Sequence, residues 1–137
     1  MAKKFQVEIV TPNRVFFDDE VEKFVVRTTN GDIAVLRDHT PLVTPVEIGR
    51  AKLIFGDEDE REATISPGIL TVDDSKAILL TDAAEWPEEI DLDRAERAKK
   101  RAKERLDAQK KNEVDETRAQ VSLRKAVNRI ELAKRKK

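Results

Sequence analysis

The sequence predicts an α+β protein with two segregated domains, an N-terminal β-sandwich followed by a C-terminal two-helix antiparallel hairpin. From residue 5 to about residue 83, short apolar segments are separated by turn residues, a pattern typical of antiparallel strands. Residues 91–110 then contain no Gly, Pro or β-branched side chain, and this composition favours helix. Because Trp86-Pro87 separates the two patterns, we expect domains at residues 1–86 and 87–137.

The first domain opens with a strand, because Phe5, Val7 and Ile9 alternate with polar neighbours. Asn30-Gly31 predicts a tight hairpin turn, since both residues tolerate positive φ. Short strands at regular spacing predict a sandwich or barrel, because one strand pair buries too little apolar surface to be stable. The remaining strands are expected at residues 15–17, 21–29, 33–36, 42–46, 51–55, 61–65, 69–72 and 77–80.

The second domain is predicted to be two helices with narrow apolar faces. Asp91 is the expected N-cap of the first helix, and a connection at 110–114 precedes a second helix that begins near Asp115. Such thin faces pair as a hairpin but need each other, the β domain or another protein to stay folded. The apolar positions are Leu92, Ala95, Ala98, Ala102 and Leu106 in the first helix, and Ala119, Leu123, Ala126, Ile130 and Ala133 in the second.

The net charge of −1 conceals two oppositely charged segments. Residues 1–89 carry 10 basic and 19 acidic side chains, whereas residues 90–137 carry 17 basic and 9 acidic ones. The basic tail therefore suits an anionic partner, which is a nucleic acid, an acidic protein face or a phosphate ligand. Nucleic acid fits least well, because the tail has no aromatic side chain for base stacking and the adjoining domain is acidic.

Catalytic and metal-binding motifs are missing from the sequence. With no Cys and one His, zinc modules and thiol chemistry are excluded, and the scattered glycines form no phosphate-binding loop. The acidic runs at 18–19 and 57–60 lack the spacing of a calcium loop, so we expect no metal site. The longest apolar runs have four residues, far short of the roughly 20 needed to span a bilayer, so we expect no direct membrane insertion.

Four cations of the tail have a spacing that suits a phosphate ligand. Arg94 and Arg101 are seven residues apart in the first helix, and Lys125 and Arg129 are four apart in the second. In a folded hairpin these side chains could surround a polyphosphate with charge-assisted contacts. Spacing alone leaves this alternative open beside an acidic protein partner.

The order of these parts, together with local stretches of sequence, resembles the epsilon subunit of bacterial F-type ATP synthases over essentially the whole chain. Residues 7–12 (VEIVTP) resemble the family's first strand and its Thr-Pro turn, and residues 67–72 (PGILTV) are similar to a later strand. Ala34, Arg37 and Asp38 stand where the family usually has Gly, Pro and Gly. The residues of the 31–42 stretch that match the family signature are Gly31, Leu36, His39, Pro41 and Leu42.

Residues 90–95 (IDLDRA) resemble the motif by which some bacterial epsilon subunits bind ATP. Lys125 stands where better binders have an arginine. ATP would be a regulatory ligand, and no cofactor is required. The resemblance places ATP contacts on Glu85, Ile90, Asp91, Arg94, Ala95, Arg101 and Arg129.

The resemblance implies a ten-stranded β-sandwich and a non-catalytic rotor subunit of a proton- or sodium-translocating ATP synthase, peripheral at the cytoplasmic face of the bacterial plasma membrane. Asp32 and His39 would contact the c-ring and the gamma subunit. In an extended form, Arg118, Arg124 and Lys125 would meet an acidic segment of the beta subunits in the alpha–beta head and block ATP hydrolysis. ATP would favour the compact form. The alternative is a free-standing β-sandwich adaptor whose basic hairpin binds an acidic protein.

Overall fold

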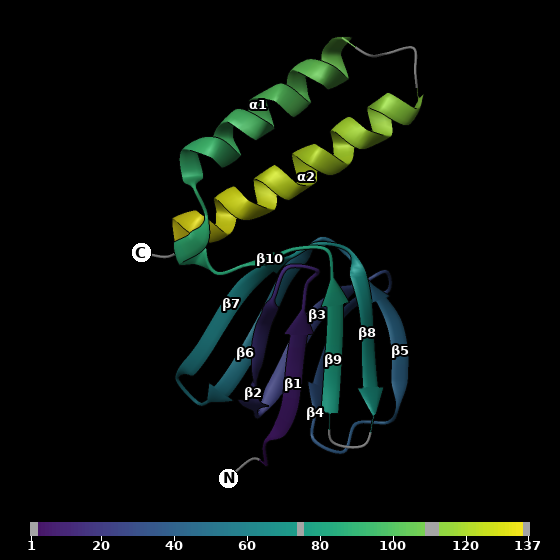
Figure 1. The fold of residues 1–137 in the computed structure, drawn as a ribbon, viewed down its shortest axis with the longest axis vertical. Helices are drawn as coiled ribbons and strands as arrows, with labels where there is room; N and C mark the ends of the chain where they lie inside the picture. Colours follow the sequence, from purple (N-terminus) through teal and green to yellow (C-terminus); the bar gives the residue numbers. More distant parts are fainter. Residues whose placement is uncertain (1–2, 74–75, 109–112, 136–137) are drawn as a thin grey trace. The chain divides into compact units, whose positions relative to one another are not determined.

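The chain divides into two units, residues 1–85 and 86–137. The computed structural model describes residues 3–73, 76–108 and 113–135. The first unit is built from strands and the second from helices, so the predicted α+β class, a β-sandwich followed by a helical hairpin, is confirmed (Figure 1). The division lies one residue before the boundary expected from the sequence.

Among the described residues of the first unit there are ten strands, as the family resemblance implies. They are β1 (Phe5–Val10), β2 (Val15–Val21), β3 (Lys23–Thr28), β4 (Gly31–Leu36), β5 (Leu42–Val46), β6 (Gly49–Gly56), β7 (Asp59–Ile65), β8 (Gly68–Asp73), β9 (Lys76–Thr81) and β10 (Ala84–Glu85).

The strands form two halves, which are linked by one pair of bridged residues between β3 and β5. One half has the order β4-β3-β6-β7-β10 and the other β5-β8-β9-β1-β2, and Thr28 of β3 pairs with Val46 of β5 between them. All neighbours are antiparallel except β1 and β9, which run parallel. The backbone N–H of Glu22 donates to the carbonyl of Ile54 at 2.8 Å, which ties the corner between β2 and β3 to β6.

Strand alternation places the core between the two halves. In β1, the buried side chains of Phe5, Val7 and Ile9 alternate with half-exposed neighbours, and burying each such side chain contributes about 1.5–3 kcal/mol. The largest fully buried side chains of the unit are Phe24, Ile9, Leu53, Leu70, Leu79, Val7, Val21, Val26 and Val35.

Three details of the strands differ from the sequence prediction. β2 continues through the acidic residues 18–20 to Val21, because an exposed edge strand tolerates charges that a core strand does not. β10 was not predicted. The predicted hairpin is confirmed, because β3 and β4 pair up to Thr28 and Gly31, but its two loop residues are Thr29 and Asn30. Among the described residues, only Gly31 and Asp38 have positive φ, 103° and 66°, so Asn30 does not use the positive φ that it tolerates.

The second unit begins with a short 3-10 helix, η1 (Pro87–Glu89), and continues as α1 (Leu92–Ala108) and α2 (Glu113–Arg135). The Asp91 side chain accepts a hydrogen bond from the Arg94 N–H at 3.1 Å, which confirms the predicted N-cap. α2 begins at Glu113, so residues 113–114 belong to a helix and not to the predicted connection, whose residues 110–112 lie outside the described ranges. Ala95 and Ala102 of α1 face Ala119, Ala126 and Ile130 of α2 along a buried seam.

Candidate functional site

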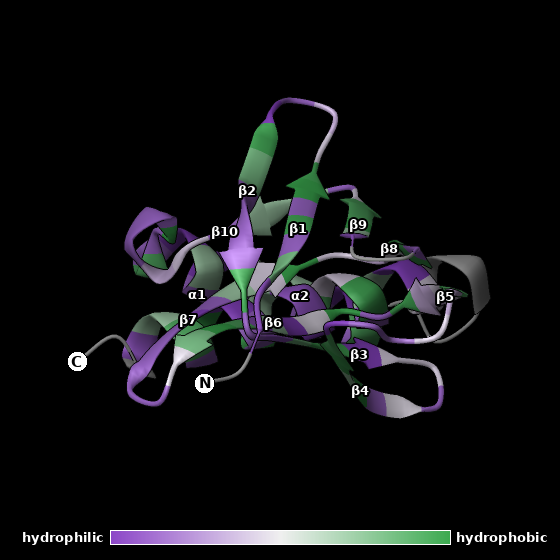
Figure 2. Cartoon of the chain, turned by 90° about the horizontal axis from the view of Figure 1, so that it is seen from below, coloured by the Kyte–Doolittle hydropathy of each residue, from purple (hydrophilic) through white to green (hydrophobic). Residues whose placement is uncertain are grey.

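A row of apolar side chains crosses the outer face of the half-sandwich that contains β1. Each member is the direct cross-strand partner of the next, and such partners point to the same face of a sheet. Val15, Leu80 and Ile69 are 61%, 54% and 51% exposed. We call this set the apolar row: Val15 of β2, Val10 of β1, Leu80 of β9, Ile69 of β8 and Pro45 of β5. Figure 2 shows the hydrophobic end of β1 and start of β2, where the row begins.

An open pocket of about 380 Å³ lies against the middle of the apolar row. Its floor is tight, because a Cβ on Gly68 would overlap the carbonyl oxygen of Leu80 and lie 2.9 Å from the Cα of Thr81. One wall is held by the Thr11 N–H, which donates to the Arg14 carbonyl at 2.9 Å. The lining residues are Val10, Thr11, Pro12, Pro67, Gly68, Ile69, Leu80, Thr81 and Asp82.

This surface suits protein docking better than chemistry. Exposed apolar side chains that form a continuous patch mark interaction sites, and a pocket within the patch can hold an anchoring side chain. The sequence prediction missed the row, although a signal was present. Val15, Ile69 and Leu80 are large apolar residues at strand positions where alternation expects polar ones.

Asp32 and His39, the residues assigned to rotor contacts, lie at opposite ends of β4. Asp32 forms an exposed ion pair with Arg27, with Nε and Oδ1 3.2 Å apart. The His39 ring lies beyond the other end of the strand, and its Nδ1 is 2.6 Å from the Thr40 carbonyl. Asp38, where the family usually has Gly, adopts the left-handed φ of 66°. The structure therefore does not bring Asp32 and His39 together at one point.

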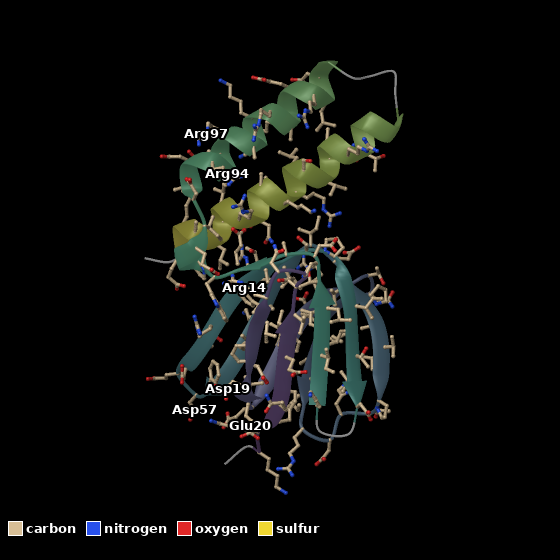
Figure 3. All side chains as sticks on the ribbon, viewed as in Figure 1. Arg14, Asp19, Glu20, Asp57, Arg94 and Arg97 are labelled. Carbon is tan, nitrogen blue, oxygen red and sulfur yellow. The ribbon has the colours of Figure 1, made fainter. Side chains whose placement is uncertain are left out.

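The residues assigned to ATP divide between packing and surface positions. Ile90 and Ala95 are buried, and the Asp91 carboxylate caps α1. Arg94 and Arg101 are exposed on α1, whereas Lys125 and Arg129 are half-buried on α2. Figure 3 shows Arg94 and Arg97 projecting from the first turns of α1. Glu85 belongs to β10 in the other unit.

The antiparallel hairpin determines which of these cations share a region. α1 and α2 pack along their length, and α2 also contacts η1 (Figure 1). The first half of α1 therefore lies beside the second half of α2, which places Arg94 and Arg129 in the same end of the hairpin. This arrangement is compatible with a phosphate ligand, because residues 90–137 have more basic than acidic side chains.

The residues assigned to inhibition do not form one face of α2. Arg118 and Lys125 are seven residues apart, which places them on the same side of a helix with 3.6 residues per turn. Arg124 projects from a different side, about 100° around the axis from Lys125. Arg118 and Arg124 are exposed and Lys125 is half-buried.

Metal-binding clusters and membrane-spanning helices are both absent from the described residues. No group of three or more His, Asp or Glu side chains in these ranges is arranged to hold a metal ion. Within the same ranges, no helix is both long and apolar enough to cross a membrane.

Comparison with known proteins gave consistent results. Residues 4–87 match the ATP synthase delta/epsilon chain β-sandwich domain, and residues 88–134 match the long α-helix domain of the same chain. The chain is similar to the ATP synthase epsilon chain of Alkaliphilus metalliredigens, with 55% identity over 99% of this chain and 100% of that one. It is 48% identical to the sodium ion specific epsilon chain of Acetobacterium woodii, over 77% and 80% of the two chains.

Solved structures share the fold at low sequence identity. A chain of the Euglena gracilis mitochondrial ATP synthase has a TM-score of 0.78 at 20% identity, covering 91% of this chain and 78% of that one. A chain of the Tetrahymena thermophila mitochondrial ATP synthase central stalk and c-ring has a TM-score of 0.61 at 14% identity, covering 98% and 96%.

Proposed function

The chain belongs to the family of bacterial F-type ATP synthase epsilon chains, non-catalytic subunits of the central stalk, and we propose that its sandwich docks the gamma subunit and the c-ring. The apolar row is the observation that carries this proposal. Val15, Leu80 and Ile69 are each at least half exposed in the isolated chain, and covering them would remove apolar surface from water at about 25 cal/mol per Å².

A charge placed inside the row tests the proposal. Ile69→Asp should weaken binding of the purified gamma subunit at least roughly tenfold, because a carboxylate buried in an apolar interface loses its hydration. Thr71→Asp is the matched control, since Thr71 is exposed on the same face of β8 but outside the row, and we expect less than roughly threefold change. Calorimetry with the folded variants measures the affinity of each one for the gamma subunit. Equal binding by wild type and Ile69→Asp would reject the row as the docking surface.

For the helical unit, we propose inhibition of ATP hydrolysis through the basic side of α2. In an extended form, Arg118 and Lys125 would approach an acidic segment of the beta subunits in the alpha–beta head, with Arg124 contributing from a neighbouring side. The basic excess of residues 90–137 supports this proposal, because the complementary partner must be anionic. The subunit would act at the cytoplasmic face of the bacterial plasma membrane, as a peripheral part of the complex.

We further propose that ATP binds the hairpin and favours its compact form. ATP can shift the two forms only by binding one of them more tightly, and a change from 1:99 to 99:1 needs a roughly 10⁴-fold difference in affinity. The cap at Asp91 and the packed Ile90 and Ala95 support the proposal, because they fix the backbone from which Arg94 projects.

The ATP proposal is tested by calorimetry of the full chain with and without Mg²⁺. Arg94→Ala should weaken ATP binding at least roughly tenfold, because a charge-assisted contact to phosphate is lost. Arg97→Ala removes the same charge from the same helix (Figure 3) and should change the affinity less than roughly threefold. An identical loss in both variants would indicate a general charge effect, and no heat with millimolar ATP would reject nucleotide binding.

The adaptor alternative makes the opposite prediction for partner choice. A free-standing adaptor would bind an acidic protein through its hairpin and would fail to associate with a gamma subunit. Co-purification with gamma from cells therefore separates the two functions.

A further inference from the structure

The outer edge of β4 has backbone groups that pair with no strand among the described residues. β4 pairs with β3 from Gly31 to Leu36 and with no other strand among the described residues, and Figure 2 shows it at the margin beside β3. Thr28 and Gly31 flank a two-residue loop, so alternate residues counted from Gly31 direct their backbone groups toward β3. The groups of Asp32, Ala34 and Leu36 therefore point away. The Leu36 carbonyl has this direction, because it accepts a hydrogen bond at 3.2 Å from the His39 N–H in the following turn and not from β3.

The other ends of the sandwich carry the devices that block strand addition. β2 presents three consecutive acids, residues 18–20, and two of them are seen projecting from it in Figure 3. β5 contains Pro45, and β10 has only two residues. Residues 33–36 of β4 contain no charge, proline or glycine, and no irregularity interrupts their register. Natural proteins protect exposed edges in these ways, so an unprotected edge indicates a strand that pairs in the functional assembly.

We propose that β4 pairs along this edge with an extended segment of the gamma subunit, which adds a strand to the half-sandwich. This inference rests on the proposed rotor function. Strand addition draws its affinity from main-chain hydrogen bonds, and side chains at alternate positions supply specificity. Leu36 is 49% exposed and offers an apolar contact. Arg37 follows it, is exposed, and has no side-chain partner among the described residues. The added segment therefore has an apolar residue facing Leu36 and an acidic residue beside Arg37.

A proline tests the edge without disturbing the sandwich. Ala34→Pro removes an N–H that points away from β3, so the β3–β4 pairing keeps its bonds, whereas a partner strand loses a donor and meets the ring. We expect at least roughly tenfold weaker binding of purified gamma, measured by calorimetry. Ala34→Thr is the matched control, because it keeps the N–H and favours strand, and it should bind within roughly twofold of wild type. Arg37→Glu should weaken binding and reduce its salt dependence.

Amide exchange of the wild-type chain supplies a measurement that needs no substitution. The N–H groups of Asp32, Ala34 and Leu36 should exchange fast in the free chain and at least roughly tenfold slower in the complex with gamma, as amides in a newly formed ladder do. Unchanged exchange at these three positions, or wild-type affinity in a folded Ala34→Pro variant, would overturn the proposal. If Ile69→Asp loses binding while Ala34→Pro does not, the docking function stands and the edge pairing falls. If neither variant loses binding, both fall.

Discussion

At the scale of single residues, Gly68 is the glycine whose Cβ position is most tightly surrounded by other atoms. It pairs with Thr81 at the floor of the pocket, and the atoms that a Cβ would meet belong to the backbone of β9. Gly68→Ala should lower the free energy of unfolding by about 1–3 kcal/mol, because β8 must shift away from β9. Gly56→Ala is the control, since no atom lies within 4 Å of its Cβ position, and we expect a change below about 1 kcal/mol. Urea denaturation followed by circular dichroism measures both; wild-type stability of Gly68→Ala would contradict the close approach.

Asp38 holds a backbone conformation that most residues avoid. Its φ of 66° is the sole positive value among the described non-glycine residues, and aspartate tolerates this region better than most side chains. Asp38→Ala should lower the free energy of unfolding by about 1 kcal/mol, whereas Asp38→Gly should not lower it. The two variants are compared by their urea midpoints at equal m values. If alanine and glycine give the same midpoint, the turn does not impose this conformation.

At the scale of elements, the sequence predicted strands wherever apolar residues alternate or cluster, and β1 and β9 are examples. It misjudged β2, because Asp18, Asp19 and Glu20 hide the strand pattern and only pairing with β1 shows that the strand continues. β10 depends on its pairing with β7, which involves residues about 20 positions away in the chain. Local periodicity carries no information about such pairings.

The helices show the same limit. The predicted seam includes Ala119, Ala126 and Ile130, which are buried, but Leu132 is buried as well and lies off that seam. The seam was predicted from two helices alone, whereas α2 also contacts η1. The apolar row was missed for a related reason: its members lie on five strands, and only the strand order makes them neighbours.

The N-cap of α1 provides a prediction for one element. Asp91→Ala should lower the free energy of unfolding of the helical unit by about 1 kcal/mol, because the Arg94 N–H loses its acceptor. Asp91→Ser should retain most of that stability, since serine is also a good cap. Thermal unfolding of the full chain, followed by circular dichroism at 222 nm, compares them. Equal melting of all three chains would show that the cap contributes nothing measurable.

At the scale of the whole molecule, the two units carry opposite net charge, and the tasks that we propose fall on different units. The apolar row and the β4 edge both belong to residues 1–85, whereas the basic excess belongs to the helices. A chain ending at residue 86 should therefore bind gamma within roughly threefold of the full chain. ATP hydrolysis by the assembled synthase should rise by roughly tenfold or more with the truncated chain, because the basic contact that we propose to restrain the head is absent.

A full-length variant separates the loss of charge from the loss of the helices. Arg118→Ala with Lys125→Ala removes two cations from one side of α2 and keeps its helical composition. Hydrolysis should rise with this variant too, but less than with the truncated chain, because the other cations of the tail remain. ATP hydrolysis is measured with complexes reconstituted at equal subunit occupancy from the wild-type chain, the truncated chain or the double variant. A truncated chain that binds gamma normally and leaves hydrolysis unchanged would refute the inhibitory role while preserving the docking role of the sandwich.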